Sequence, residues 1–219
     1  MNIMTSNGVY EVYPIKTDLI RLGDSLEHLL SYVEPYLSDD DTVFVSEKVI
    51  SIIQGRIRYP EEVKVSKLAS FLSSKVNQRS DGNLNNPESM EMAIREVGTI
   101  RILIAAMVAA ITKPLGIKGM FYRIAGKKVR GIDSPDKGGL PPYNEFISLT
   151  PESPNTWANK ISQIINHKAV IVDANDIGVN ILGVSDEDMD RKLCAEIFIS
   201  NPLGQKREQT PIAIVRKRQ

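Results

Sequence analysis

Two short apolar runs constrain the fold of this chain most strongly. Thr42–Val45 and Ala169–Val172 are each four residues long and rich in β-branched side chains. That length and composition favour buried strands over helices. Gly8–Ile15 and Ile212–Val215 add a first and a last strand. Apolar residues at helical spacing occupy much of the sequence between them, so the sequence predicts a mixed α+β fold.

The expected helices follow the recurrence of apolar residues every three or four positions. We predict them in Ser25–Leu37 behind a Ser25 cap, Lys64–Val76, Ser89–Ile111 and Asp186–Ser200. Pro151–Ile165 is predicted to begin as a loop and continue as a helix through Trp157 and Ile161. Val49–Ile57 fits a helix or a strand equally well. Within the long helix, residues 100–111 are too few for a membrane span and predict a buried core helix. We expect a single domain over residues 1–219, and a subdivision near 113–120 stays open.

Composition narrows the class of protein. The 219 residues hold 27 Lys and Arg against 27 Asp and Glu, so the net charge does not indicate nucleic acid or anionic lipid as a partner. A single cysteine, Cys194, excludes an intrachain disulfide and a cysteine-based zinc site. Residues 1–13 lack the pattern of a secretory signal. We therefore expect a cytoplasmic protein with no membrane partner.

Two acidic clusters are the strongest candidates for chemistry. Asp133 and Asp136 lie in a glycine-flanked segment, and Asp173, Asn175 and Asp176 follow the apolar run at 169–172. Oxygen donors of this kind suit hard cations such as Mg²⁺ or Mn²⁺. The alternative is that both clusters are ordinary turns, because Asp and Asn are also common turn residues.

Basic residues offer candidate phosphate contacts. Ser46 and Lys48 follow the strand at 42–45, where they could meet a phosphate. Lys127–Arg130 reads as a basic glycine-flanked loop that either cradles phosphate or forms a solvated hairpin. Gly116–Gly119 is a weak match to the GxxG loop of some RNA-binding modules.

Other common sites are not indicated. The sequence contains no phosphate-binding P-loop, dinucleotide fingerprint or nucleophile elbow. The two histidines, His28 and His167, are far apart in sequence, which argues against a histidine metal site. Cys194 lies between apolar neighbours and predicts a buried, inert thiol.

The order of these segments resembles the γ-glutamyl ligases that add glutamate to the deazaflavin coenzyme F(420). Six stretches carry the resemblance, each similar to a motif of that family. They are Tyr13–Asp24, Val45–Arg56, Gly131–Ser134, Leu149–Pro154, Asp173–Gly178 and Gly204–Arg216. No single stretch is specific, but their order covers nearly the whole chain.

The resemblance implies a GTP-dependent ligase that uses two divalent cations, Mn²⁺ or Mg²⁺, and forms an intertwined homodimer. Its substrates would be L-glutamate and a small-molecule acceptor, joined through an acyl phosphate. Transferred by position, Lys48 and Asp133 become the catalytic residues, with Ser46 and Lys48 at the phosphates. The nucleotide would contact Pro14, Ile15, Lys16, Thr17 and Asp136, and the metals would contact Asp133, Asp173, Asn175 and Asp176.

Departures from the family pattern leave alternatives open. Asp136 stands where the family has Asn, and the alignment does not decide whether Asp173 or Asn175 takes the second metal position. The segment after Asp176 is also shorter than in the family, which leaves the acceptor unidentified. A folate-type acceptor is one alternative. A catalytically diverged nucleotide- or RNA-binding protein is another, of a different class.

Overall fold

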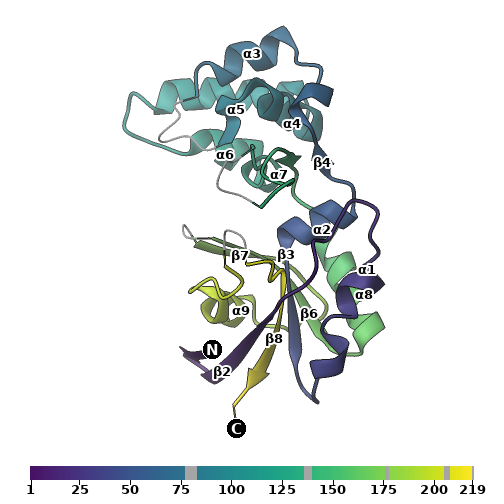
Figure 1. The fold of residues 1–219 in the computed structure, drawn as a ribbon. Coiled ribbons are helices and arrows are strands. Elements are labelled where there is room, and N and C mark those ends of the chain that lie inside the picture. The colour runs from purple at the N-terminus through teal and green to yellow at the C-terminus, as the bar shows by residue number, and fades with distance from the viewer. Residues whose placement is uncertain (77–82, 136–139, 176–177, 205–207, 219) are drawn as a thin grey trace. The chain divides into compact units, whose positions relative to one another are not determined.

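The chain consists of two compact units (Figure 1). The computed structural model describes residues 1–76, 83–135, 140–175, 178–204 and 208–218. Residues 1–55 and 151–219 form the first unit, and residues 56–150 form the second. The second unit is thus an insertion in the first, and residues 113–120 lie inside it. A single ligase-like domain over the whole chain stays a prediction.

A six-stranded mixed sheet forms the centre of the first unit. Its strand order is β1-β2-β8-β3-β6-β7. The pair β3–β6 is parallel, and the other neighbouring pairs are antiparallel. The strands are β1 (Asn2–Thr5), β2 (Gly8–Ile15), β3 (Thr42–Ser46), β6 (Lys168–Asn175), β7 (Gly178–Val184) and β8 (Ile212–Lys217). The four strands expected from sequence are confirmed, whereas β1 and β7 are additional.

Helices cover both faces of this sheet (Figure 1). Val43, Val45 and Ile171 pack on one face with α1 (Leu26–Leu30), α2 (Glu47–Ile53) and α8 (Pro154–Ile165). The alternate residues face α9 (Arg191–Phe198), where Phe44 stacks on Phe198 with ring centroids 4.2 Å apart. Burial of both faces explains why β3 and β6 are continuous apolar runs. The mixed α+β class is confirmed.

Capping side chains set where the helices begin. The Ser25 hydroxyl accepts from the His28 N–H at 3.2 Å, as expected, but α1 ends at Leu30 rather than Leu37. Pro35 follows in the 3-10 helix Glu34–Tyr36, and proline has no N–H to continue an α-helical ladder. In the open segment 49–57, residues up to Ile53 belong to helix α2, whereas Ile57 begins a short strand, Ile57–Arg58. Asp190 caps α9, which therefore begins later than Asp186.

The second unit is mainly helical around its own apolar core. Its elements are β4 (Ile57–Arg58), β5 (Ile147–Ser148), α3 (Lys67–Ser73), α4 (Pro87–Val97), α5 (Thr99–Thr112), α6 (Met120–Ala125), α7 (Lys127–Arg130) and two 3-10 helices, Pro60–Glu62 and Asn83–Asn85. The prediction of one helix over Ser89–Ile111 is wrong. Gly98, at φ 85° and ψ 151°, separates α4 from α5.

Helix α5 is less buried than its sequence predicts. Only Ile102 and Ala105 are buried, whereas Ile100 and Met107 are 76% and 64% exposed. The expectation of a buried core helix at 100–111 is therefore wrong, because α5 packs one face against the second unit's core and leaves another apolar face uncovered. No helix in the described part of the chain is long and apolar enough to cross a bilayer.

Candidate active site

One edge of the sheet gathers four chain segments that are far apart in sequence. Ile15 pairs with Ile212, Val45 also pairs with Ile212, and Ser46 pairs with Val172. The carboxyl ends of β2, β3 and β6 therefore lie beside the start of β8. Since neighbouring strands are about 4.8 Å apart, these ends span roughly 15 Å. Three of the stretches predicted to bind nucleotide or metal meet at this edge.

The first of these stretches leaves the sheet at the end of β2. Pro14 and Ile15 are the last residues of the strand, and Lys16 and Thr17 follow. Thr17 is only 4% exposed; its N–H donates to the Gln209 carbonyl at 2.9 Å, and its hydroxyl donates to the Asp18 carbonyl at 2.7 Å. The main chain here is thus anchored against the segment before β8. Lys16 is exposed and supplies the positive charge of the stretch.

Ser46 and Lys48 occupy the junction of β3 and α2. Ser46 ends the strand, stands at the N-cap of α2 and donates its N–H to the Pro211 carbonyl at 2.8 Å. Lys48 lies in the first turn of α2 and is exposed, whereas Val49 and Ile50 after it are buried. The junction therefore holds Lys48 at the same sheet edge as Lys16.

Asp173 and Asn175 lie within β6 rather than in a turn after it. The strand was expected to end at Val172, but pairing with β7 extends it to Asn175, with Asp173 opposite Asn180. Sequence reasoning missed this because backbone pairing with a second strand outweighs the turn preference of Asp and Asn. Residues two apart on a strand share a face. Accordingly the Asn175 Nδ2 lies 3.4 Å from the Asp173 Oδ1.

Asp133 belongs to the second unit. Its backbone pairs with Ser148, with N–O distances of 2.9 and 3.0 Å, and the residue is exposed. The next residue, Ser134, places its hydroxyl 2.7 Å from that of Ser89. Asp136 and Asp176, the other two predicted acidic residues, lie outside the described residues.

The donor chemistry at the sheet edge is compatible with a hard cation. Asp173 offers carboxylate oxygens, and the Asn175 amide oxygen, which accepts from the Gly178 N–H at 3.1 Å, lies on the same face. Mg²⁺ commonly uses one or two protein carboxylates together with water and substrate phosphates. Within the described residues, no group of three or more His, Cys, Asp or Glu side chains forms a ready-made metal cage.

The structure also places the weaker candidates from the sequence, namely the two histidines, Cys194 and Lys127–Arg130. His28 contacts the Tyr32 ring, while His167 lies between the Ile165 and Ser38 carbonyls, so the two histidines have separate surroundings. Cys194 is buried, and burial raises the pKa of its thiol to about 11, which fits an inert cysteine. Lys127–Arg130 is the short helix α7, so both the loop and the hairpin predicted there are wrong.

Sequence reasoning missed the polar contacts that support this edge. Gln209 and Pro211, just before β8, accept the Thr17 and Ser46 N–H groups. Elsewhere in the first unit, the Gln54 amide donates to the Glu152 carbonyl at 3.0 Å and accepts from the Glu152 N–H at 2.8 Å. In the sequence, these four residues were indicated only because they lie in stretches that resemble family motifs.

Comparison with known proteins identifies the family. A family model described as F(420)-0:gamma-glutamyl ligase matches residues 14–187, most of the chain. The match includes the ends of β2, β3 and β6, where three of the predicted stretches meet. No curated protein matches the chain significantly. The chain therefore belongs to the F(420)-0:gamma-glutamyl ligase family.

Proposed function

We propose that this protein is a GTP- and divalent-metal-dependent ligase that adds L-glutamate to an F(420)-type acceptor. Its family consists of γ-glutamyl ligases, which supports an enzyme acting on small-molecule substrates. The observation that carries the finer proposal is the register of β2, β8, β3 and β6. It gathers two exposed lysines and two oxygen-donor side chains at one sheet edge.

The reaction needs an activated carboxylate, because a carboxylate and an amine do not condense in water. In the first step an acceptor carboxylate oxygen attacks the γ-phosphorus of GTP, and the bond to the leaving GDP oxygen breaks. The glutamate amine then attacks the acyl carbon of the resulting acyl phosphate. Inorganic phosphate leaves, the amine loses a proton, and an amide remains. Both substrates of the first step are anions, so the site must reduce their repulsion.

The residues at the sheet edge suit that task. Lys16 and Lys48 carry positive charge beside main-chain segments that are hydrogen-bonded to Gln209 and Pro211. Asp173 and Asn175 would hold a cation, which when bound neutralises phosphate charge. The family resemblance also predicts Asp133 and Asp176 as metal ligands and Asp136 as a nucleotide contact. Fixed positioning of charge, rather than covalent chemistry by the protein, is the contribution that this edge supports.

Thermal unfolding with nucleotides tests the binding part of the proposal. GTP at about 100 times its dissociation constant, with Mn²⁺ or Mg²⁺, should stabilise the protein by roughly 2.7 kcal/mol. For a chain of this length that raises the melting temperature by roughly 5–10 °C. The shift should be smaller for ATP and should shrink without metal. Absence of a shift with every nucleotide would contradict the proposal and favour a diverged protein.

Ligation assays test the chemistry. With GTP, metal and L-glutamate, an F(420)-type acceptor should gain the mass of glutamyl residues, and a folate-type acceptor should not. We expect Lys48→Ala and Asp173→Asn each to lower the rate at least about tenfold, as expected for lost electrostatic stabilisation. Lys192→Ala, at an exposed lysine on α9, is the matched control and should keep full activity.

A homodimer is part of the proposal, as the family resemblance implies. The surface that supports it is the apolar face of α5, where Ile100, Ile104, Met107 and Ile111 recur at helical spacing and are each at least 49% exposed. Monomeric proteins rarely leave such a continuous apolar face uncovered. Light scattering should give twice the chain mass of 24.4 kDa, and Met107→Lys should shift the protein toward the monomer.

A further inference from the structure

The second unit contains a cavity that the proposed ligase chemistry does not use. It lies among α3, α4, α5 and α6 and has a volume of about 170 Å³. Leu72, Leu84 and Met90, all buried, contribute to its lining, and the flat rings of Phe121 and Tyr122 add aromatic surface. An apolar cavity of about 150 Å³ is large enough to take up benzene. The space therefore fits one phenyl ring or a short alkyl chain.

Among the described residues, the charged side chains that line the cavity are all positive. Lys75, Lys113 and Lys118 line it and are exposed, and no acidic side chain is among the described residues of the lining. The Lys75 ammonium also lies 5.5 Å from the centroid of the Phe71 ring. Lysines bury their methylene stems along apolar surface while the ammonium stays in water. A ligand with an apolar body in the cavity would meet these cations with its polar end.

We propose that this cavity binds a small amphiphilic carboxylate, with an aromatic or short alkyl body inside and the carboxylate beside the lysines. Apolar lining with a few polar groups that fix orientation is the common composition of small-molecule sites. The site lies in the helical unit and uses none of the residues assigned to nucleotide or metal. Its existence is thus independent of the ligase proposal and goes beyond it.

Calorimetric titration of the full chain with three probes of one shape tests the proposal. Phenylacetate is the carboxylate probe, phenylacetamide is its neutral analogue and phenethylamine carries the opposite charge. Phenylacetate should bind at least about fivefold more tightly than the amide, and the amine should bind most weakly, since each exposed ion pair changes affinity by roughly two- to fivefold. Equal affinities for the three probes would overturn the proposed recognition of charge.

Variants then locate the binding. Ala109 and Ala110 both line the cavity on α5, so Ala109→Phe and Ala110→Phe should fill it or close its mouth and weaken phenylacetate by about tenfold or more. Ala110 is exposed, so its variant should fold even if that of Ala109 does not. Lys113→Gln and Lys118→Gln should each weaken phenylacetate but not the amide.

The matched control is Lys67→Gln, at an exposed lysine on α3 that does not line the cavity. It should leave the affinity for phenylacetate unchanged. Amide chemical-shift changes on titration should map to α3, α5 and α6. No binding of phenylacetate, or binding that survives Ala110→Phe with shift changes elsewhere, would overturn the proposal.

Discussion

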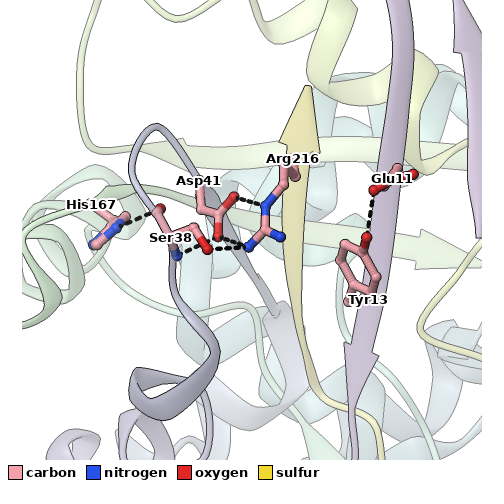
Figure 2. Close-up of polar contacts among 6 residues, drawn as sticks. All are labelled: Glu11, Tyr13, Ser38, Asp41, His167 and Arg216. Carbon is pink, nitrogen blue, oxygen red and sulfur yellow. Dashed lines mark hydrogen bonds and ion pairs between the residues drawn. The ribbon is translucent and has the colours of Figure 1, made fainter. Parts of the chain in front are cut away.

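The Asp41 carboxylate accepts two hydrogen bonds from the Arg216 guanidinium, at 2.8 Å from Nε and 2.7 Å from Nη2 (Figure 2). The Asp41 side chain is fully buried, and the Ser38 N–H also donates to it at 2.8 Å. Thr42, next to Asp41, pairs with Val215, next to Arg216. The ion pair thus joins the turn before β3 to β8, at the opposite end of β3 from Ser46. Its position indicates a structural role for the arginine that ends the last family-like stretch.

Removal of this carboxylate should destabilise the fold. Asp41→Ala leaves the Ser38 N–H and two Arg216 donors without their acceptor, and we expect a loss of about 2–4 kcal/mol. We place this loss of stability toward the low end of the cost of breaking a buried ion pair, because the Arg216 side chain is 36% exposed. Urea unfolding measures the change. Asp39→Ala, at an exposed position in the same turn, should have little effect, and equal stability of the two variants would contradict this account.

Acid should remove the same stabilisation. Burial alone would raise the pKa of Asp41, but hydrogen bonds from Arg216 and the Ser38 N–H outweigh it and hold the pKa below its ordinary value of 3.8. A group with a lowered folded pKa stabilises fully above its unfolded pKa and loses that effect as pH falls through the folded value. The stability difference between wild type and Asp41→Asn should therefore be constant from pH 7 to about 5 and shrink below about pH 4. A stability difference that does not shrink in acid would contradict this role of the ionised Asp41 carboxylate.

A second ion pair joins the two ends of the helical unit to α4. Arg56 and Thr150 are its first and last residues; the Arg56 Nε donates to the Thr150 carbonyl at 2.7 Å, and its Nη2 lies 2.6 Å from the Glu96 Oε2. Both charged side chains are mostly buried, at 14% and 13% exposure. Glu96→Ala should thus cost about 2–4 kcal/mol. Hydrogen exchange should show weaker protection across α4, and Glu61→Ala, at an exposed glutamate, should leave protection unchanged.

Local sequence patterns predicted the helices and strands that are specified by residues close together in the sequence. The apolar run that becomes β3, the Ser25 cap of α1 and the spacing that becomes α8 each contain the information that specifies them. The boundary at Gly98 is one that local patterns do not predict. Periodicity continues across it, but the positive φ of Gly98 ends one helix and starts another, a choice that depends on how α4 and α5 pack.

The candidate site shows the same limit at longer range. Sequence alone singled out Lys48 and Asp173, but strand order decides that they share an edge, and strand order depends on pairing between segments more than a hundred residues apart. The family resemblance predicted only that both belong to one active site, and no local pattern contains the strand order. For Asp133 the sequence named the residue, while the fold assigns it to the inserted unit.

Two glycines on β7 give a matched test of packing against α8. A Cβ at Gly183 would overlap the Pro154 carbonyl group and crowd the Asn155 N–H, whereas one at Gly178 would meet nothing within 4 Å. Because all the atoms in its way are backbone, α8 would have to move, and the bond from the Val184 N–H to the Asn155 Oδ1, at 3.1 Å, would be strained.

Gly183→Ala should therefore destabilise the protein by about 3 kcal/mol or slightly more, at the upper end of the range for overpacking. Gly178→Ala should change stability by no more than about 0.5 kcal/mol, as for most exposed positions. Thermal melts of both variants at one protein concentration measure the contrast. If the two substitutions shifted the melting temperature equally, the close approach of β7 to the start of α8 would not be a determinant of the fold.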